Sequence, residues 1–98
     1  MAAVEASAQG VHWAFAPMLD VARDPRWGRV VEGPGEDTRV GAALAVAQVQ
    51  RLQGDSGLAS PTALMATAKH FVAYGAAEGG RDYNATEVSE RTLWDVYL

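Results

Sequence analysis

Two short stretches of the sequence carry the side chains best suited to bind a ligand. Lys69 and His70 are adjacent within an apolar run, where a cation is rarely found unless it is paired or bound to something. Arg29 follows Trp27 and Gly28 in the stretch DPRWGR. Guanidinium, ammonium and imidazole groups all donate hydrogen bonds, so these side chains can bind a carboxylate or a set of neighbouring hydroxyls.

The adjacency of Lys69 and His70 sets a geometric condition. Successive side chains of a strand point to opposite faces of the sheet. Both residues can therefore serve one ligand only where the backbone bends, bulges or carries a strained peptide. The alternative is a strand end at which both side chains simply reach solvent.

Other polar residues of the same loops have both a functional and a structural interpretation. Arg81 lies in a second glycine-rich stretch, GGRDYN, which is either a ligand-binding loop or a self-bonded turn. Arg26 is expected to pair with Asp24 or Asp20 and to brace its loop. Trp27 either stacks on the apolar face of a ligand or, as a large aromatic residue, covers the core.

The acids of the stretch EGPGED do not identify a catalytic residue. Glu32 or Glu36 could serve as a catalytic carboxylate, but Glu36 and Asp37 also stand where the N-terminus of a helix favours negative charge. No metal site is predicted, because His12 and His70 are far apart in the sequence and the chain has no cysteine. No phosphate-binding glycine loop is present, so no cofactor is expected.

Two apolar segments must position these side chains. Residues 11–19 and 63–74 are near-continuous apolar runs, which are typical of strands buried on both faces of a parallel sheet. Pro17 cannot donate to a sheet ladder, so the pairing of the first strand is expected to end near Ala16.

Helices are expected on either side of each apolar run. The first residues form a helix that ends at Gly10. A second helix is capped by Asp37 or Thr38, carries apolar residues at helical spacing and ends at Gly54. A third begins with Ser89 as its cap.

This alternation predicts an α/β fold with parallel strands and right-handed crossovers. The loops at 20–37 and 75–88 are long, and each follows the C-terminal end of a strand, where α/β proteins build their sites. Two strand–helix units make about a quarter of a (β/α)8 barrel. Both ends resemble helices that are cut short, so we expect residues 1–98 to be a partial barrel domain, with no complete domain present.

The composition narrows the possible partners. The chain of 98 residues has a net charge of −4 and only 8 Lys and Arg residues, which argues against nucleic acid as a ligand. No apolar run reaches the roughly 20 residues that span a bilayer, so no membrane partner is expected. Met1 opens directly onto an alanine-rich helical stretch, so no secretory signal is predicted.

Three long motifs together resemble one enzyme family. The stretches FAPMLDVARDPRWGRVVEGPGED, AKHFVAYGAAEGGRDYN and TEVSERTLWDVYL are similar, in this order, to the N-terminal barrel domain of glycoside hydrolase family three. The similarity is strongest to its bacterial periplasmic β-glucosidases. One branch of this family, the β-N-acetylglucosaminidases, carries a Pro-Gly-His stretch after Lys-His-Phe. Here Lys-His-Phe is followed by VAY, which argues against an amino-sugar substrate.

The resemblance implies an exo-acting retaining hydrolase of terminal β-linked glucosyl residues, located in the periplasm or secreted. It maps sugar-binding residues onto Arg29, Lys69, His70 and Arg81, with a β-glucoside or oligosaccharide as the ligand. The nucleophile, an aspartate followed by tryptophan, is missing, and Asp95 in LWDVYL does not replace it. We therefore expect the isolated chain to be inactive and to need the remainder of the parent enzyme.

Other interpretations stay open at this point. A non-catalytic sugar-binding module would keep the same donors while lacking both carboxylates that glycoside hydrolysis requires. An inactive truncated gene product is a further alternative. Neither composition nor motifs distinguish a β-glucoside from a β-xyloside as the substrate.

Overall fold

The computed structural model describes all 98 residues, from Met1 to Leu98. Its helices are α1 (Ala2–Ala8), α2 (Thr38–Gln53) and α3 (Glu90–Thr92), and α3 continues into a π-helical turn at Leu93–Tyr97. Single 3-10 turns lie at Val30–Glu32, Gly57–Ala59, Tyr74–Ala76 and Glu78–Gly80. None of the helices has the length and hydropathy that crossing a membrane requires.

The helix boundaries confirm the predicted caps. The side chain of Asp37 accepts a hydrogen bond from the backbone N–H of Val40 at 2.8 Å and so begins α2. Gly54 ends this helix with a φ of 74°, a conformation that glycine adopts readily. The Ser89 hydroxyl accepts the backbone N–H of Thr92 at 3.1 Å and begins α3.

The two apolar runs lie side by side and parallel, as predicted, but they do not form regular strands. Pairing is limited to two isolated parallel bridges, Trp13 with Met65 and Met18 with Lys69. From Trp13 to Met18 the first segment advances by five residues, whereas from Met65 to Lys69 the second advances by only four. The extra residue acts like a β-bulge and interrupts the ladder.

The prediction that pairing ends near Ala16 is wrong. The carbonyl oxygen of Pro17 accepts the N–H of Lys69 at 3.1 Å, and the N–H of Leu19 donates to the Lys69 carbonyl at 2.7 Å. A proline lacks only the donor, so its carbonyl group continues the pairing.

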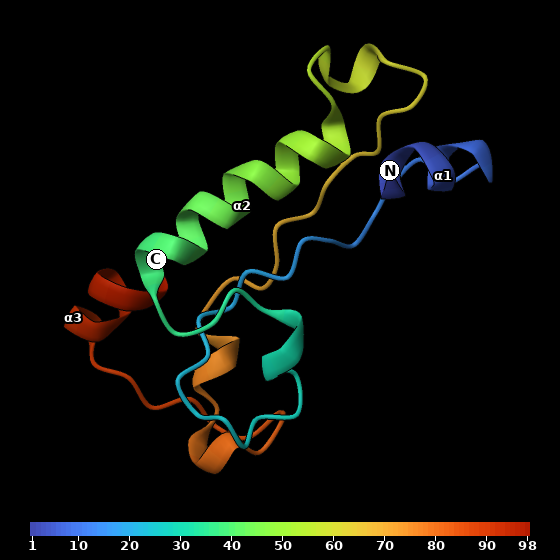
Figure 1. The fold of residues 1–98 in the computed structure, drawn as a ribbon. Coiled ribbons are helices and arrows are strands. Elements are labelled where there is room, and N and C mark those ends of the chain that lie inside the picture. Colours follow the sequence, from blue (N-terminus) through green and yellow to red (C-terminus); the bar gives the residue numbers. More distant parts are fainter.

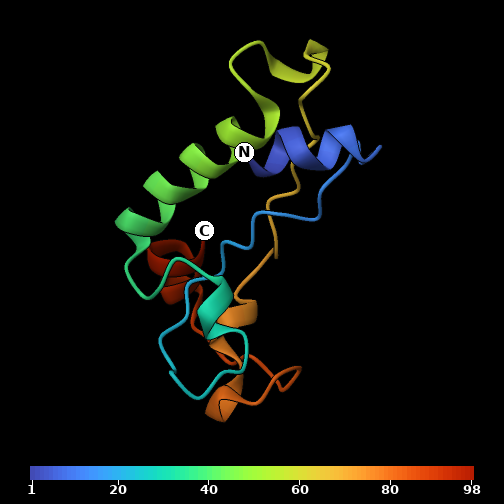
Figure 2. The ribbon, with the colours of Figure 1, turned by 45° about the vertical axis from the view of Figure 1, so that its right-hand side comes forward.

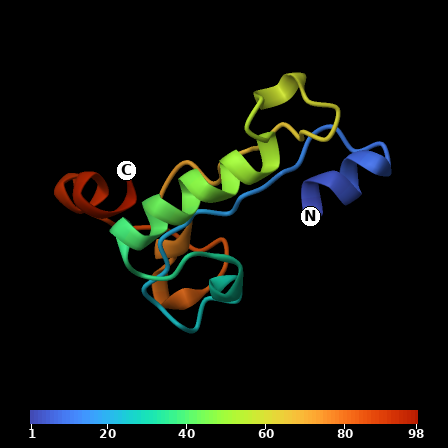
Figure 3. The same ribbon diagram turned by 45° about the horizontal axis from the view of Figure 1, so that its top comes forward.

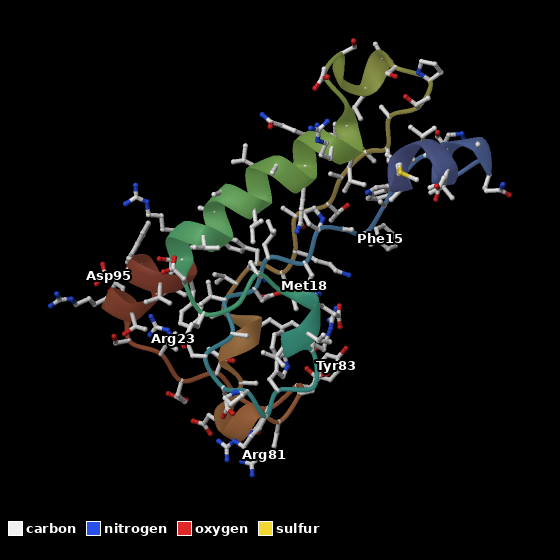
Figure 4. The ribbon with its side chains drawn as sticks, viewed as in Figure 1. Phe15, Met18, Arg23, Arg81, Tyr83 and Asp95 are labelled. Carbon is white, nitrogen blue, oxygen red and sulfur yellow. The ribbon has the colours of Figure 1, made fainter.

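The predicted burial of the apolar segments is also wrong. The molecule is elongated, 42 Å by 23 Å by 17 Å, so little of its surface faces other parts of the chain. Trp13 and Phe15 are 54% and 67% exposed, and Figure 4 shows Phe15 pointing away from the chain. On α2, Val46 is 58% exposed, although it belongs to the apolar stripe.

The core instead lies among the loops. Met18, Ala22 and Trp27 form one buried cluster, and Val30 and Tyr74 pack against it. Figures 1 and 2 show the loops that follow the paired segments gathered at one end of the molecule, with α2 and α1 toward the other. In Figure 3, α2 runs along the paired segments, and α3 lies beside its first turn.

Candidate functional site

Lys69 and His70 lie at the end of the second paired segment, against the loop that follows the first. The peptide bond between them is cis, and the Met18–Lys69 bridge is the last pairing before the two segments diverge. The backbone therefore departs from a regular strand at the place where the sequence places two neighbouring polar side chains. Both side chains are half-buried.

The ring of His70 is held by Asp20. One carboxylate oxygen of Asp20, Oδ2, lies 2.7 Å from His70 Nδ1 and 3.1 Å from the His70 backbone nitrogen. The Asp20 side chain is buried, whereas a third of the His70 side chain remains exposed. The second ring nitrogen of His70, Nε2, makes no hydrogen bond within the chain.

Arg29 is held by Glu32 in a bidentate ion pair. Its Nε and one terminal nitrogen each donate to a Glu32 carboxylate oxygen at 2.7 Å. This hydrogen-bonded pair raises the pKa of Arg29 above its ordinary value and lowers the pKa of Glu32. Three of the five N–H donors of the guanidinium point outside the pair and stay available.

Tyr74 lies against both Arg29 and His70. The guanidinium carbon of Arg29 lies 5.5 Å from the centre of the Tyr74 ring, and the His70 ring meets the same ring edge to face at 4.7 Å. Residues that are 41 positions apart in the sequence are thus brought into contact with one aromatic ring. Their shared neighbour restricts the positions of both.

Asp82 holds the hydroxyl group of Tyr74. Its Oδ1 atom accepts the Tyr74 hydroxyl at 2.6 Å and the Trp27 indole N–H at 2.9 Å. The hydrogen bond to Asp82 raises the pKa of Tyr74 to about 12, and the bonds from Tyr74 and Trp27 lower the pKa of Asp82. Trp27 is 1% exposed, so the core interpretation of this residue is confirmed.

Lys69 adds a second positive charge to that of Arg29 in the surroundings of Glu32. Its ammonium group makes no hydrogen bond or ion pair within the chain. Its charge contributes, after that of Arg29, to lowering the pKa of Glu32. Lys69 therefore keeps all three of its donors for an external group.

Arg81 stands apart from these residues. Figure 4 shows its side chain at the lower tip of the molecule, directed into solvent. Another arginine of the first loop, Arg26, makes the predicted pair with Asp24 through contacts of 2.7 to 3.2 Å. This exposed pair lowers the pKa of Asp24 to about 2.

Every acid at the site already has a partner. Asp20 is bound to His70, Glu32 to Arg29, and Asp82 to Tyr74 and Trp27. These carboxylates orient other side chains, so the cluster presents hydrogen-bond donors and no unpaired carboxylate. Such a surface can bind and orient a polar molecule.

One hollow beside these residues is a different kind of surface. It has a volume of about 430 Å³ and lies between the start of α2, the segment 68–72 and the C-terminal turn. Asp20, Lys69 and His70 line it, but most of its wall is apolar. An apolar wall fits the packing of further side chains better than it fits the hydroxyls of a polar ligand.

Three residues of this cluster are not among the predicted site residues. The sequence indicates Asp20 only as a possible partner of Arg26 and Asp82 only as part of the stretch GGRDYN, and it predicts no role for Tyr74. One signal points to them: Asp20 and Tyr74 lie at the C-terminal ends of the apolar runs, where parallel α/β folds converge, and Asp82 lies in the loop that follows. The pairing among them depends on tertiary contacts.

Comparison with known proteins identifies the family. Residues 1–98 match the glycosyl hydrolase family 3 N-terminal domain over their whole length. The chain therefore belongs to this family of glycoside hydrolases, and its fold is a fragment of the family's TIM-barrel domain.

Individual relatives agree with this assignment. The chain is 44% identical over its full length to the periplasmic beta-glucosidase of Salmonella typhimurium, and 42% identical over 92 residues to a putative beta-xylosidase of Formosa agariphila. The beta-glucosidase of Listeria innocua in complex with glucose superimposes with a TM-score of 0.94 at 48% identity, covering 98% of this chain. The chain spans 13%, 12% and 14% of the lengths of these three proteins.

Proposed function

We propose that this chain supplies part of the sugar-binding subsite of an exo-acting retaining β-glucosidase. In this proposal, Arg29 and Lys69 donate hydrogen bonds to the hydroxyls of the terminal glucosyl ring, and His70 bonds to a hydroxyl through Nε2. Arg81 would act from the edge of the site, since its side chain lies in solvent, apart from the other three.

One observation carries the proposal: two of the three side chains, Arg29 and His70, are already bound by acids of the same chain. Arg29 is paired with Glu32, and His70 with Asp20. A site for an anion would leave these charges for the ligand. A neutral ligand rich in hydroxyls, which both donate and accept, needs directed polar groups with little net charge. The remaining N–H groups of Arg29 and Lys69 and the free Nε2 atom of His70 meet that need.

Hydrolysis would require groups from elsewhere. A retaining glycosidase uses two carboxyl groups about 5 Å apart, one as the nucleophile and one as the acid/base. The acids of this cluster are engaged with other side chains, so we infer that both catalytic carboxylates come from the remainder of a longer enzyme, of which residues 1–98 form a partial barrel domain. Its location would be the periplasm or the exterior of the cell, by analogy with the Salmonella relative.

A β-xyloside is the second candidate substrate. The 42% identity to the Formosa putative beta-xylosidase favours it. Glucose and xylose differ only by the exocyclic hydroxymethyl group, so the same donors would serve the ring hydroxyls of both sugars.

The test is a chimera in which residues 1–98 replace the matching segment of the Listeria innocua enzyme. We expect it to hydrolyse nitrophenyl β-glucoside, and we expect Lys69→Ala to lower kcat/KM about 100-fold or more, because misplaced or missing positioning groups have effects of this order. Nitrophenyl β-xyloside, assayed in parallel, distinguishes the two substrates.

The isolated chain and Arg39→Ala serve as controls. The chain by itself should hydrolyse neither substrate. Arg39 lies in the first turn of α2 and is exposed, so Arg39→Ala should leave the activity of the chimera unchanged. A folded chimera that is inactive, or in which Lys69→Ala has no effect, would contradict the proposal. If the full replacement does not fold, a graft of residues 19–86 carries the same cluster.

A further inference from the structure

Asp20 differs from the other acids of the chain in its burial and in its partner. It is the buried acid of the structure, with a side chain that is 1% exposed. A buried carboxylate is costly unless hydrogen bonds compensate for the water that it has lost. In this fold, the compensation comes from a single residue, His70.

The geometry of this contact fixes the His70 ring at two points. Asp20 Oδ2 accepts the backbone N–H of His70 at 3.1 Å and lies 2.7 Å from its ring nitrogen Nδ1. A carboxylate that accepts at Nδ1 selects the form of the ring that carries a proton there. The Tyr74 ring packs edge to face with the His70 ring, and the two ring centres lie 4.7 Å apart.

These restraints determine which atom of His70 is presented. With Nδ1 turned toward buried Asp20, the ring nitrogen Nε2 lies on the opposite edge, and a third of the side chain is exposed. Without Asp20, the ring could rotate about its side-chain torsions and Nε2 would have no fixed direction.

We propose that Asp20 is a positioning residue for sugar binding, which holds the His70 ring so that Nε2 meets a hydroxyl of the bound sugar. This inference rests on the proposed function, because it assumes that His70 binds the sugar. It adds a residue that has no contact with the ligand and acts only through His70. The proposed role requires that the effect of Asp20 disappear when the imidazole is absent.

A double-mutant cycle tests this requirement in the Listeria chimera. Asp20→Ala should lower kcat/KM for nitrophenyl β-glucoside by about 10- to 100-fold, since small displacements of a positioned group reach this size. In a His70→Ala background, the same substitution should change kcat/KM less than about twofold, because residues that act as a unit are not additive. Asp20→Asn, which keeps one acceptor oxygen, should retain more activity than Asp20→Ala.

Asp24→Ala is the matched control. Asp24 is an acid of the same loop, but it pairs with exposed Arg26 and contacts none of the proposed sugar-binding residues. We expect its replacement to change kcat/KM less than about twofold in both backgrounds.

The possible results separate the two proposals. Equal losses from Asp20→Ala with and without His70 would show a general structural role and overturn the inference, while the proposed function would stand. A folded chimera without any hydrolysis would overturn both. If the Asp20→Ala variant does not fold, the cycle is run with Asp20→Asn. Equal losses from Asp20→Asn with and without His70 would likewise overturn the inference.

Discussion

Trp27 and Trp13 belong to two regions of the molecule that hold their side chains in different ways. Trp27, in the loop after the first paired segment, is 1% exposed, packs on Tyr74 and donates to Asp82. Trp13, on the paired segment itself, is 54% exposed, although its indole N–H also has a partner, Thr67, at 2.6 Å. The buried core therefore lies in the loop region, whereas the region around α2 has no comparable core.

The difference shows which parts of the chain are stabilised by its own contacts. The loop region closes around a small apolar cluster and a network of paired polar groups, all supplied by residues within the chain. The region of α2 leaves large apolar side chains in solvent, and surfaces of that kind usually contact another part of a protein. This contrast agrees with the proposal of a partial domain, whose helical face would be covered by the rest of the enzyme.

The largest effect is expected from the two tryptophans. Trp27→Ala should lower the free energy of unfolding by about 3–5 kcal/mol, the cost of removing a buried aromatic side chain. Trp13→Ala should cost about 1 kcal/mol, the size of one hydrogen bond. Urea unfolding followed by far-ultraviolet circular dichroism measures both. Equal losses would mean that the two regions are equally stabilised and would contradict the comparison.

Two glycines give an intermediate effect with opposite signs. A Cβ atom at Gly75 would collide with the backbone carbonyl oxygen of Val21, so Gly75→Ala should destabilise the fold by about 1–3 kcal/mol. At Gly41 in α2, the nearest atom to a new Cβ is Pro34 Cγ at 3.4 Å, an ordinary contact. Gly41→Ala should therefore stabilise the fold by about 0.5–1 kcal/mol, because alanine favours the helix.

Gly28→Ala is the control for these glycines. It lies in the loop region, but a Cβ atom there would have no neighbour within 4 Å. The substitution should leave the urea midpoint unchanged. A loss like that of Gly75→Ala would show that the loops resist any added side chain, and that close packing at Gly75 is not the cause.

The smallest effect is expected in the titration of Tyr74. Its hydrogen bond to Asp82 raises the pKa of Tyr74 from 10.0 to about 12. The fold therefore favours the neutral phenol, and this contribution to stability is present below pH 10 and is lost as the pH rises through about 12. Asp82→Asn should move the pKa of Tyr74 back toward 10.0, which tyrosinate absorbance measures.

Tyr74→Phe identifies the signal in this titration. The titration step near pH 12 should disappear in this variant. If the Asp82→Asn variant still shows the step near pH 12, the raised pKa of Tyr74 does not depend on the charge of Asp82, and the explanation given for it is wrong.

Local patterns in the sequence determined the helices and their ends. Asp37 and Ser89 cap α2 and α3, and Gly54 ends α2, because capping depends on a few neighbouring residues. The parallel pairing of the two apolar runs followed from the alternation of elements. The family resemblance rested on contiguous motifs and required no contact between them.

Tertiary contacts decided the rest. The loss of regular strands, the pairing beyond Pro17 and the exposure of the apolar runs depend on what lies beside each segment, which the segment itself does not encode. Asp20 and His70 are 50 positions apart in the sequence, and no local pattern links them. The sequence by itself determined which side chains could donate to a ligand, whereas only the fold decided which acids hold them and in which direction, because hydrogen-bond geometry depends on distances across the chain.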